Sequence, residues 1–579
     1  MSKDILILGI HDGHNCGAAL TVNGRVAAAI CEERLTRRKN DVGFPERSIR
    51  EVLRLAGADP RDLAEVAYAS EFMHQTSYLT DLGPWYRVGL ADQRKDAERS
   101  KDYQKLVFDQ RRRERIEQAV ALLGGPAERV GFVEHHLAHA AGAYYTYPHY
   151  RPGEPVLCVT CDGSGDGVAA TVNVCRGNAI ERIATTGRHA SLGKIYSRTT
   201  MLMGMTPWEH EYKLMGLAPY ADPERCHRAA EPLRQLLRLR PDGLGFEQVG
   251  ELSINYCYEY LREAFERVRF DVVAGAAQLF TEEMLLGLVR GAVAHTGIGR
   301  VCLAGGVFMN VKANMLLAAL PEVERLHVMP SCADESLAIG ACLHRYYQLS
   351  AEPEHASSVL ENLYLGGDFG LAEEEAAVSR MLSGTGVAVS RPADVDLAAA
   401  DMLARGQVVA RSRGRMEWGA RALGNRSILA RADDYRVVAK INDMIKMRDF
   451  WMPFAPSIRA ESAGRYFDDP KDQRPHFMIY AYPSKPATYP QLTAGSHPKD
   501  RTVRPQVVTA EANPGYHKLI GAFEERTGMG VVLNTSFNLH GFPIVYTPED
   551  AIDVFLRSGL DHLALNHFLL SKPAGGGQE

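Results

Sequence analysis

Short apolar runs alternate with amphipathic stretches along the first part of the chain, and this alternation constrains the fold most strongly. Several runs end in Gly, Asp or His, as strands do at a turn. The predicted strands are ILILGI, GAALTV, RVAAAI, EVAYAS, PVLCVTCDG, RVCLAGG and LHVMP. Thr281–His295 and Glu335–Leu349 have the period of about 3.6 residues that is typical of packed helices. The sequence therefore predicts an α/β fold.

Two of these strands flank Asn23-Gly24, the dipeptide that a two-residue type I′ hairpin favours. We therefore expect GAALTV and RVAAAI to pair, in a sheet of mixed direction. At 579 residues the chain is too long for one core, and a prior of roughly 150 residues per domain gives two to four domains. The polar stretch SAEPEHASS, Ser350–Ser358, is predicted to be a linker between domains 1–352 and 353–579. No internal repeat is visible.

Bulk composition excludes several classes of function. The net charge of −5 gives no general attraction for nucleic acid or anionic membranes, so we expect neither as a partner. No window reaches the ~18 apolar residues of a membrane helix, and MSKDILILGI is predicted to be a first strand, not a signal peptide.

The ten cysteines show no disulfide framework. Cys158 and Cys161 are predicted to be buried strand residues, with a redox pair as the alternative. We expect a cytoplasmic protein.

An arginine-rich string punctuated by glycine, GRMEWGARALGNRSIL, begins at Gly414. Arg415, Arg421 and Arg426 are spaced by Gly, Ala and Leu, a composition too apolar for an ordinary wet surface. A planar guanidinium matches two oxygens of a phosphate or carboxylate at once. Together with NTSFN at Asn534–Asn538, the string predicts a phosphate or nucleotide pocket. The alternative is a solvated charged face.

The string HHLAHA places His135 and His139 four residues apart on one helical face, a spacing that can deliver two imidazoles to one metal ion. Asp162 and Asp334, at predicted strand ends, would complete such a site. A zinc protease needs Glu directly after the first His, and His136 stands there, so that interpretation fails. Histidines with carboxylates suit iron, zinc or manganese without choosing among them. Two ordinary core or surface histidines are the alternative.

Three Gly-rich loops follow predicted strands: GIHDGHNCGA, CDGSGDG and LAGGVFMN. Backbone N–H groups of such loops can approach phosphate oxygens. Three in one half of the chain are the pattern of the actin and sugar-kinase type of ATPase fold, and neither GxxxxGK[ST] nor GxGxxG is present. His14, in the first loop, is well placed to be a general base on a hydroxyl. The alternative is a histidine that only bonds backbone.

Taken together, the chain resembles the NodU/CmcH family of O-carbamoyltransferases, which includes enzymes that decorate antibiotics and nodulation factors. The resemblance covers nearly the whole chain through ordered strings: HNCGAAL, EERLTRRKND, HHLAHA, CDGSGD, EYKLMGLAPY, LAGGVFMNVKAN, PSCADESLAIGA, GRMEWGARALGNRSIL, PFAPS and NTSFN. It implies an actin-like N-terminal domain related to threonylcarbamoyl-transferases, followed by a YrdC-like α/β domain.

The resemblance also implies a chemistry. In the C-terminal domain, carbamoyl phosphate would be cleaved and the carbamate joined to AMP from ATP, with Mg²⁺, giving carbamoyl-adenylate and pyrophosphate. In the N-terminal domain, Fe²⁺ or another divalent metal would help to transfer the carbamoyl group to a hydroxyl of a small natural product or sugar. The implied partners are therefore small molecules; the acceptor and the oligomeric state stay open.

Matching motifs assign residues to these steps. His14 is the implied catalytic base. The implied metal ligands are His135, His139, Asp162 and Asp334, and the residues implied to line the adenylate are Glu211, Lys213, Gly306 and Asn310. Those implied to bind carbamoyl phosphate and ATP are Arg421, Lys446, Arg504, Gln506 and Ser536.

Two positions depart from the family pattern. Met452 stands before PFAPS where many members carry arginine, so either Arg448, Arg426 or Arg501 supplies the cation or the carbamoyl-phosphate site is altered. DES at Asp334–Ser336 replaces the usual DDG or DGG, which keeps the carboxylate and adds bulk beside it.

Two other functions are left open by the sequence. One is a small-molecule kinase on the actin-like fold, which leaves the arginine-rich second domain unexplained. The other is a non-catalytic regulator that binds a nucleotide or carbamate. The stretch Ser70–Arg115 is a candidate for shaping the acceptor site through its aromatics, with a packed helical insertion as the alternative. These aromatics are Phe72, Tyr78, Trp85, Tyr86 and Tyr103.

Overall fold

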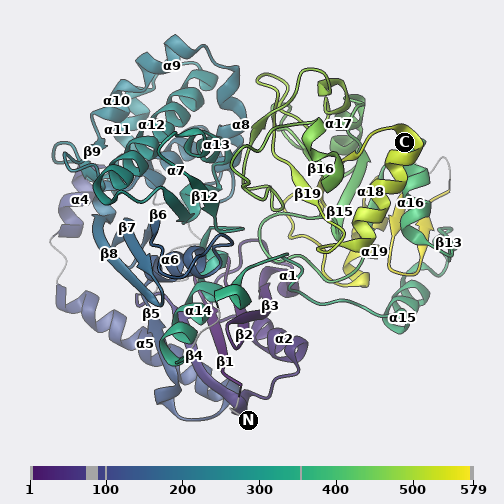
Figure 1. Cartoon of the computed structure of the whole chain (residues 1–579), viewed down its shortest axis with the longest axis horizontal. Coiled ribbons are helices and arrows are strands. Elements are labelled where there is room, and N and C mark those ends of the chain that lie inside the picture. The colour runs from purple at the N-terminus through teal and green to yellow at the C-terminus, as the bar shows by residue number, and fades with distance from the viewer. Residues whose placement is uncertain (1–3, 73–88, 98–100, 352–354, 574–579) are drawn as a thin grey trace. The chain divides into compact units, whose positions relative to one another are not determined.

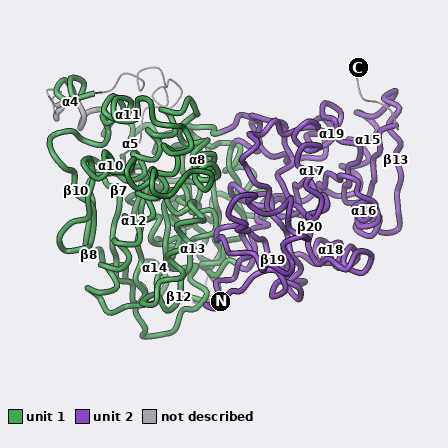
Figure 2. Tube along the Cα trace, turned by 90° about the horizontal axis from the view of Figure 1, so that it is seen from above, with its two compact units in different colours: residues 1–32, 40–360 green, residues 33–39, 361–579 purple. Residues whose placement is uncertain are grey.

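The chain divides into two compact units (Figure 2). The structure is a computed structural model that describes residues 4–72, 89–97, 101–351 and 355–573. Unit 1 comprises Met1–Glu32 and Asn40–Leu360, and unit 2 comprises Glu33–Lys39 and Glu361–Glu579. The boundary expected from sequence, between residues 352 and 353, lies close to this division. The sequence did not predict that Glu33–Lys39 belongs to unit 2.

The first sheet of unit 1 has the strand order β3-β2-β1-β4-β5. Its strands are β1 (Leu6–His11), β2 (Gly17–Val22), β3 (Arg25–Cys31), β4 (Leu63–Ala69) and β5 (Val130–Val133). Strand β2 is antiparallel to β1 and β3, whereas β4 and β5 continue parallel to β1. Asn23 and Gly24 both have positive φ, 49° and 77°, as a type I′ turn requires. The predicted hairpin in a sheet of mixed direction is confirmed.

The second sheet of unit 1 repeats this topology, with the order β12-β11-β6-β7-β8. Its strands are β6 (Val156–Gly165), β7 (Val168–Arg176), β8 (Ala179–Gly187), β11 (Arg300–Ala304) and β12 (Arg325–Val328). Strand β6 is antiparallel to β7 and parallel to β11, just as β1 is to β2 and β4. Unit 1 therefore contains a duplicated backbone plan, although its sequence shows no repeat, because many apolar sequences satisfy the same strand pairing.

Two helices lie between the sheets. Helix α6 (His135–Tyr145) packs on β6, β7 and β11, helix α14 (Leu337–Leu349) packs on β1, β2 and β4, and the two helices pack on each other (Figure 1). They cross at glycines: a Cβ on Gly340 would lie 1.9 Å from the carbonyl oxygen of Ala138. This close crossing brings the start of α6 and the segment before α14 to the same place.

The other faces of the two sheets are also covered by helices. Helix α2 (Glu46–Ala56) packs on β2 and β3, and both α7 (Leu192–Leu202) and α12 (Phe270–Thr296) pack on β6. The other α-helices among the described residues of unit 1 are α4 (Leu90–Ala97), α5 (Lys101–Leu123), α8 (Glu211–Leu217), α9 (Pro223–Ala229), α10 (Glu231–Arg234), α11 (Tyr258–Ala264) and α13 (Val311–Ala319). Strand β9 (Leu237–Leu239) pairs with β10 (Phe246–Gln248).

Helix α12 differs from what the sequence predicted about membrane segments. By length and composition it is long and apolar enough to cross a bilayer, the one helix among the described residues that is. However, 72% of its most apolar window is buried inside the protein. It packs against α7, α8, α9 and α13, so its apolar surface is used within unit 1.

Unit 2 is built on an eight-stranded sheet of order β13-β22-β21-β14-β15-β20-β16-β19. Its central strands include the predicted runs: β14 (Val409–Ser412) and β20 (Val531–Ser536), with β15 (Arg426–Arg431) between them. The other strands are β13 (Ala388–Ser390), β16 (Ala455–Arg459), β19 (Gln506–Val508), β21 (His562–Ala564) and β22 (Leu569–Ser571), with β17 (Tyr482–Pro483) and β18 (Thr502–Val503) forming a separate pair. Both units are therefore α/β.

Helices of unit 2 pack in pairs. Helix α16 (Val395–Ala404) packs on α18 (Pro514–Thr527), and α15 (Leu371–Leu382) packs on α19 (Pro548–Arg557). Helix α17 (Arg436–Ile441) runs into a short π-helical turn, η10 (Asn442–Lys446), that ends at Met447 with φ 46°. The segment Glu33–Lys39, with α1 (Glu33–Thr36), belongs to this unit because Arg34 and Arg37 donate to its carbonyl oxygens, at Gly419 and Ile544.

The predicted linker Ser350–Ser358 is wrong over its last residues. His355–Ser358 form a 3-10 turn, and Ser358 Oγ donates to the carbonyl oxygen of Gly24 at 2.9 Å. The imidazole of His355 is buried and stacks 3.6 Å from the ring of Tyr150, beside Tyr144 and Tyr347. This polar stretch is therefore partly anchored in unit 1, because its histidine packs among aromatic rings.

Candidate functional site

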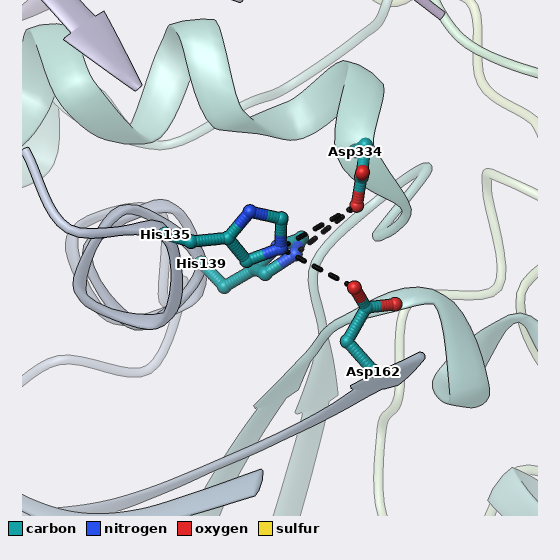
Figure 3. Close-up of side chains that lie close together, drawn as sticks. All are labelled: His135, His139, Asp162 and Asp334. Atoms are coloured by element: carbon teal, nitrogen blue, oxygen red, sulfur yellow. Dashed lines mark hydrogen bonds and ion pairs between the residues drawn. The ribbon is translucent and has the colours of Figure 1, made fainter. Parts of the chain in front are cut away.

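The four predicted metal ligands converge in unit 1. His135 and His139 stand on the first turns of α6, Asp162 lies near the end of β6, and Asp334 begins the 3-10 turn η8 (Asp334–Ser336) before α14. One ligand atom from each lies within 4.8 Å of all the others (Figure 3). We call these four residues the His–Asp cluster. The helix crossing described above produces this convergence, since it brings α6 beside the segment that holds Asp334.

The two imidazoles present the same nitrogen to the carboxylates. His135 Nε2 lies 3.3 Å from Asp162 Oδ2, and both Nε2 atoms lie 3.6 Å from Asp334 Oδ1. The Nδ1 atom of each imidazole contacts a serine hydroxyl. His135 Nδ1 is 3.1 Å from Ser70 Oγ, and His139 Nδ1 is 3.3 Å from Ser336 Oγ. Each ring is thus fixed by a hydroxyl, a common way in which proteins orient metal-binding histidines.

The chemistry of the His–Asp cluster fits a divalent cation. His139 Nε2 is buried and has no hydrogen-bond partner among the described residues, which is costly unless something else binds it. Burial alone would lower the pKa of His135, but Asp334, Asp162 and Asp166 outweigh it and raise that pKa to about 9. Burial likewise opposes the charge on Asp334, yet His135 and His139 hold the pKa of its carboxyl well below the usual range. Two nitrogens and two carboxylates around one point are a set of ligands that iron, zinc or manganese accepts.

Backbone contacts of the surrounding loops hold the cluster in place. Gly306 N–H donates to Asp162 Oδ1 at 3.0 Å. Asp166, at φ 50° in the turn after β6, accepts the N–H of His135 at 2.8 Å and that of Glu71 at 2.9 Å. Gly165 leaves space for an imidazole, because a Cβ there would lie 2.0 Å from His135 Cγ. Ser70, Ser336 and Asp166 were not predicted as site residues; for Asp166 and Ser336 the signal was their place in CDGSGDG and DES.

The predicted base His14 is not one of the four clustered residues. It lies in the loop after β1, and its ring centroid is 6.1 Å from that of Trp208. His11 holds this loop: it is buried, and its Nε2 is 3.1 Å from the carbonyl oxygen of His14. Burial lowers the pKa of His11, opposed by Asp334 and Asp12. Asp12 itself forms a buried ion pair of 2.6 Å with Arg115.

The four residues predicted to line an adenylate make different contacts from one another in the structure. Gly306 touches the His–Asp cluster, as just described. Glu211 begins α8, where it accepts Ser197 Oγ–H at 2.7 Å, and burial raises its pKa. Lys213 lies two residues further along α8. Asn310 caps α13 and exchanges two amide hydrogen bonds with Gln278, at 2.9 and 3.0 Å. The oxygen Oδ1 of Asn310 also accepts the N–H of Ala313 at 3.1 Å, so a ligand contact through this oxygen would compete with two existing bonds.

In unit 2, two of the five predicted phosphate-binding residues meet directly. Lys446 Nζ donates to Ser536 Oγ at 3.0 Å and to Asn538 Oδ1 at 2.7 Å. Lys446 is buried, and this burial, followed by repulsion from Arg448, lowers its pKa well below the usual value. A lysine in this state gains from an anion, because the anion stabilises the charged ammonium that burial has deprived of water.

The loop that carries Arg421 is folded by buried polar side chains. Glu417 Oε1 accepts the backbone N–H groups of Leu423, Asn425 and Arg426 at 2.6, 3.2 and 3.1 Å. Gln506 Nε2 donates to the carbonyl oxygen of Leu423 at 2.7 Å, and Gln506 Oε1 accepts Ser457 Oγ–H at 2.7 Å. Gln506, predicted as a direct contact, is thus used here to support the loop. Arg421 and Arg504 are half-buried, in the loops before β15 and β19.

The expectation that the whole arginine-rich string faces an anion is wrong for Arg426, whose guanidinium bonds the backbone. Arg426 is buried, and its guanidinium donates to the carbonyl oxygens of Tyr546, Arg413, Gly414 and Asn425, at 3.0 to 3.2 Å. Arg415 donates to the carbonyl oxygens of Gly366 and Leu365. Both arginines serve as donors for backbone carbonyls, which need partners once they are buried.

Met452 has a structural explanation. Its side chain is buried, only 4% exposed, so this is a core position in which an arginine would bury a charge. Of the three arginines considered as substitutes, Arg426 is used by the backbone, Arg448 lies over the ring of Phe454 at 5.0 Å, and Arg501 lies over the ring of Tyr489 at 4.8 Å.

The predicted buried state of Cys158 and Cys161 is confirmed, since both are fully buried and free in β6.

The stretch predicted to shape the acceptor site falls largely outside the described residues: Tyr78, Trp85 and Tyr86 lie outside them, as does the side chain of Tyr103. Within them, the Phe72 ring lies 4.7 Å from that of Phe108.

Comparisons with known proteins agree with the motifs. Residues 6–343 match the family described as Carbamoyltransferase N-terminus, and residues 400–572 match Carbamoyltransferase C-terminus. The nodulation protein NolNO of Sinorhizobium fredii is 32% identical over 99% of this chain and 80% of its own length. The 3'-hydroxymethylcephem-O-carbamoyltransferase of Streptomyces clavuligerus is 30% identical over 48% of this chain and 50% of its own length.

One solved structure with some likeness is component A of the (R)-2-hydroxyglutaryl-CoA dehydratase of Acidaminococcus fermentans, 15% identical over 59% of this chain and 98% of its own, with a TM-score of 0.33. A likeness of that strength does not define the fold. The family matches do define the class: the chain belongs to the carbamoyltransferase family, and it is an enzyme. The resemblance inferred from the sequence motifs is confirmed.

Proposed function

We propose that this protein is an ATP-dependent O-carbamoyltransferase that carbamoylates a hydroxyl of a small natural product or sugar. Carbamoyl phosphate is the donor, and carbamoyl-adenylate is the intermediate. The observation that carries the proposal is the His–Asp cluster, which in a member of the carbamoyltransferase family supplies a metal-binding set of ligands beside Gly-rich loops. In this proposal unit 1 is an actin-like transferase domain and unit 2 a YrdC-like adenylating domain.

The first half-reaction is assigned to unit 2. Water cleaves carbamoyl phosphate into carbamate and inorganic phosphate, and an oxygen of the carbamate then attacks the α-phosphorus of ATP, so that pyrophosphate leaves. Lys446, supported by Ser536, and Arg421 on its folded loop are the cations that would offset repulsion between the two polyanionic substrates. The bonds of Glu417 and Gln506 to the backbone of Leu423 support this assignment, because they hold the loop that carries Arg421.

The second half-reaction is assigned to unit 1. An acceptor hydroxyl attacks the carbamoyl carbon, the bond from that carbon to the phosphate oxygen breaks, and AMP leaves with the electron pair. His14 takes the hydroxyl proton, on a loop that His11 holds from behind. His135, His139, Asp162 and Asp334 would hold Fe²⁺ or another divalent ion, which when bound supplies a Lewis acid for the carbamoyl oxygen.

Pyrophosphate release by the purified, metal-loaded protein tests the first half-reaction. We expect release from ATP that depends on carbamoyl phosphate and needs no acceptor. A kinase on this fold would instead form ADP together with a phosphorylated acceptor, and a binding regulator would release neither product. Pyrophosphate release that is independent of carbamoyl phosphate, or absent, would refute the donor assignment.

The variant His139→Ala separates the two halves. Because His139 lies in unit 1, we expect the variant to lose bound metal and carbamoyl transfer while it keeps carbamoyl-phosphate-dependent pyrophosphate release. Metal content measured by elemental analysis gives a readout apart from turnover. Loss of both half-reactions in a folded variant would contradict the assignment of separate sites.

A further inference from the structure

A lysine that the proposed chemistry does not use lies beside the His–Asp cluster. Lys194 is in the first turn of α7, and the start of that helix packs directly on the strand end that carries Asp162. Ser191 Oγ donates to the carbonyl oxygen of Gly163 at 2.5 Å, and a Cβ on Gly193 would lie 2.9 Å from the carbonyl oxygen of Asp162. The backbone of α7 therefore places Lys194 next to the cluster.

Within the described part of the chain, the ammonium of Lys194 has no carboxylate partner. Nζ donates to a neutral acceptor, Asn255 Oδ1, at 2.5 Å. Among the residues that the structure describes, no carboxylate oxygen lies within 4.0 Å of it. Arg115, a buried cation in the same unit, shows the contrast, because it is compensated by Asp12 at 2.6 Å. A cation withdrawn from water without an anion is unfavourable, so the position of Lys194 calls for an explanation.

Neighbouring charges increase the need for an anion. Arg198 lies one turn further along α7 and donates to the carbonyl oxygen of Asn255 at 3.1 Å. Burial, followed by repulsion from Arg198 and Arg188, lowers the pKa of Lys194 to about 7. The nearby carboxylate of Asp162 has the opposite effect and raises the pKa of Lys194. If Asp162 binds a cation in the cluster, that cation neutralises its negative charge. The electrostatic potential around Lys194 then becomes still more positive.

We propose that Lys194 and Arg198 form an oxyanion-binding subsite beside the His–Asp cluster, and that it takes the phosphate group of the nucleotide part of the donor. A phosphate bound there would lie beside Asp162, where the reacting end of the donor must be placed. The identification of the anion with the donor phosphate rests on the proposed function; the binding of an oxyanion does not. A carboxylate on the acceptor has the same chemistry and is the other possible source.

Binding of AMP to the full-length, metal-loaded protein measures this subsite. The titrations use calorimetry in a Lys446→Met background, so that nucleotide held at the proposed site of unit 2 does not contribute. We expect Lys194→Met to weaken AMP binding by roughly ten- to a hundredfold, the value of a hydrogen bond to a charged group. Adenosine, which has no phosphate, should bind both proteins equally. Lys194→Arg should retain part of the affinity, and Lys499→Met, at an exposed lysine, should change nothing.

A second variant separates ligand binding from a structural role. Asn255→Asp would place a carboxylate where Nζ now meets a neutral amide. This internal anion should raise the melting temperature, because it compensates the lysine, and should lower the affinity for AMP, because it occupies the subsite. A merely structural lysine would gain the same stability with no loss of binding. Unchanged AMP affinity in both Lys194→Met and Asn255→Asp would overturn the proposal.

Competition experiments identify the source of the anion. Inorganic phosphate should compete with AMP for the wild-type subsite, whereas acetate at the same concentration should not. Competition by acetate without competition by phosphate would overturn the phosphate assignment in favour of an acceptor carboxylate. Lys194→Met should also keep carbamoyl-phosphate-dependent pyrophosphate release while carbamoyl transfer falls. If the wild type releases no pyrophosphate, the proposed function fails, yet the AMP and phosphate titrations still decide whether the subsite exists.

Discussion

The His–Asp cluster of unit 1 and the arginine-rich string of unit 2 carry similar chemical signals in sequence but behave differently in the fold. In the cluster, four side chains point at one another, and His139 Nε2 has no hydrogen-bond partner among the described residues. In the string, Arg415 and Arg426 donate hydrogen bonds to carbonyl oxygens of the surrounding segments. Converging side chains with an unsatisfied atom indicate a ligand, whereas density of charge alone does not.

The difference follows from the backbone beneath each group. His135 and His139 are on a helix, where a spacing of four residues fixes them on one face. Arg415 and Arg421 lie in the loop before β15, and Arg426 is the first residue of that strand. In this loop Gly414, Gly419 and Gly424 have φ of 63°, 99° and 108°. Those turns expose backbone carbonyls inside the unit, and each buried carbonyl needs a donor. Arg426 therefore donates to three carbonyl oxygens of this segment. The anion prediction stays a prediction for Arg415 and Arg421.

The largest effect that we predict is at Gly165. In Gly165→Ala the added Cβ would lie 2.0 Å from His135 Cγ, so the imidazole must leave its place between the carboxylates. We expect loss of metal from the cluster and a fall in carbamoyl transfer of at least about a hundredfold, the scale of a misplaced catalytic geometry. Metal content and single-turnover transfer measure these effects.

Gly163 provides a matched control for that variant. It lies two residues before Gly165 in the last part of β6, and a Cβ there would meet nothing within 4 Å. Gly163→Ala should therefore keep its metal and most of its transfer activity. Equal metal content in the two variants would mean that the position of His135 is not what holds the metal, and the contrast between the two regions would lose its basis.

A second prediction contrasts Arg426 with Arg421. Arg426→Met would leave up to four carbonyl oxygens without this donor, so we expect a loss of stability of about 3 kcal/mol or more in unit 2, seen as a lower melting temperature. Arg421→Met should change stability by less than about 1 kcal/mol but raise the KM for carbamoyl phosphate by roughly tenfold or more. Steady-state pyrophosphate release gives the KM. The reverse pattern, with a destabilised Arg421→Met and an Arg426→Met that only raises KM, would contradict the assignment of the two arginines.

Local patterns predicted much of the fold. Strands β1, β2, β3, β4, β6, β11 and β12 were found from apolar runs with turn residues at their ends. Strand β8 was not, because it is an edge strand with mostly exposed, polar residues and so lacks an apolar signal. The placement of Glu33–Lys39 in unit 2 was also not predictable, since Arg34 finds its acceptor, the carbonyl of Gly419, 385 residues away. Long-range partners of this kind leave no local pattern.

The candidate site likewise contains residues that the sequence predicted and residues that it did not predict. The four cluster residues follow from helix spacing, strand ends and family motifs, and the structure brings them together. The residues behind them do not follow: Ser70 reaches His135 from an irregular position at φ 92°, and Lys194 takes its place from the packing of α7 on β6. Their relation to the cluster depends on how distant elements pack, which the spacing of residues in sequence does not encode.

The last prediction concerns these supporting hydroxyls. Ser336→Ala removes the group 3.3 Å from His139 Nδ1, so the ring would lose the contact that directs Nε2 toward Asp334. Loss of such an orienting partner typically costs about ten- to a hundredfold in metal affinity, and we expect a fall in that range, measured by competition with a chelating dye. Ser336→Thr keeps a hydroxyl and should bind more metal than the alanine variant, provided that the buried site accepts one methyl group. Unchanged affinity in Ser336→Ala would show that packing alone orients His139, and the cluster would then owe its geometry to the crossing of α6 and α14.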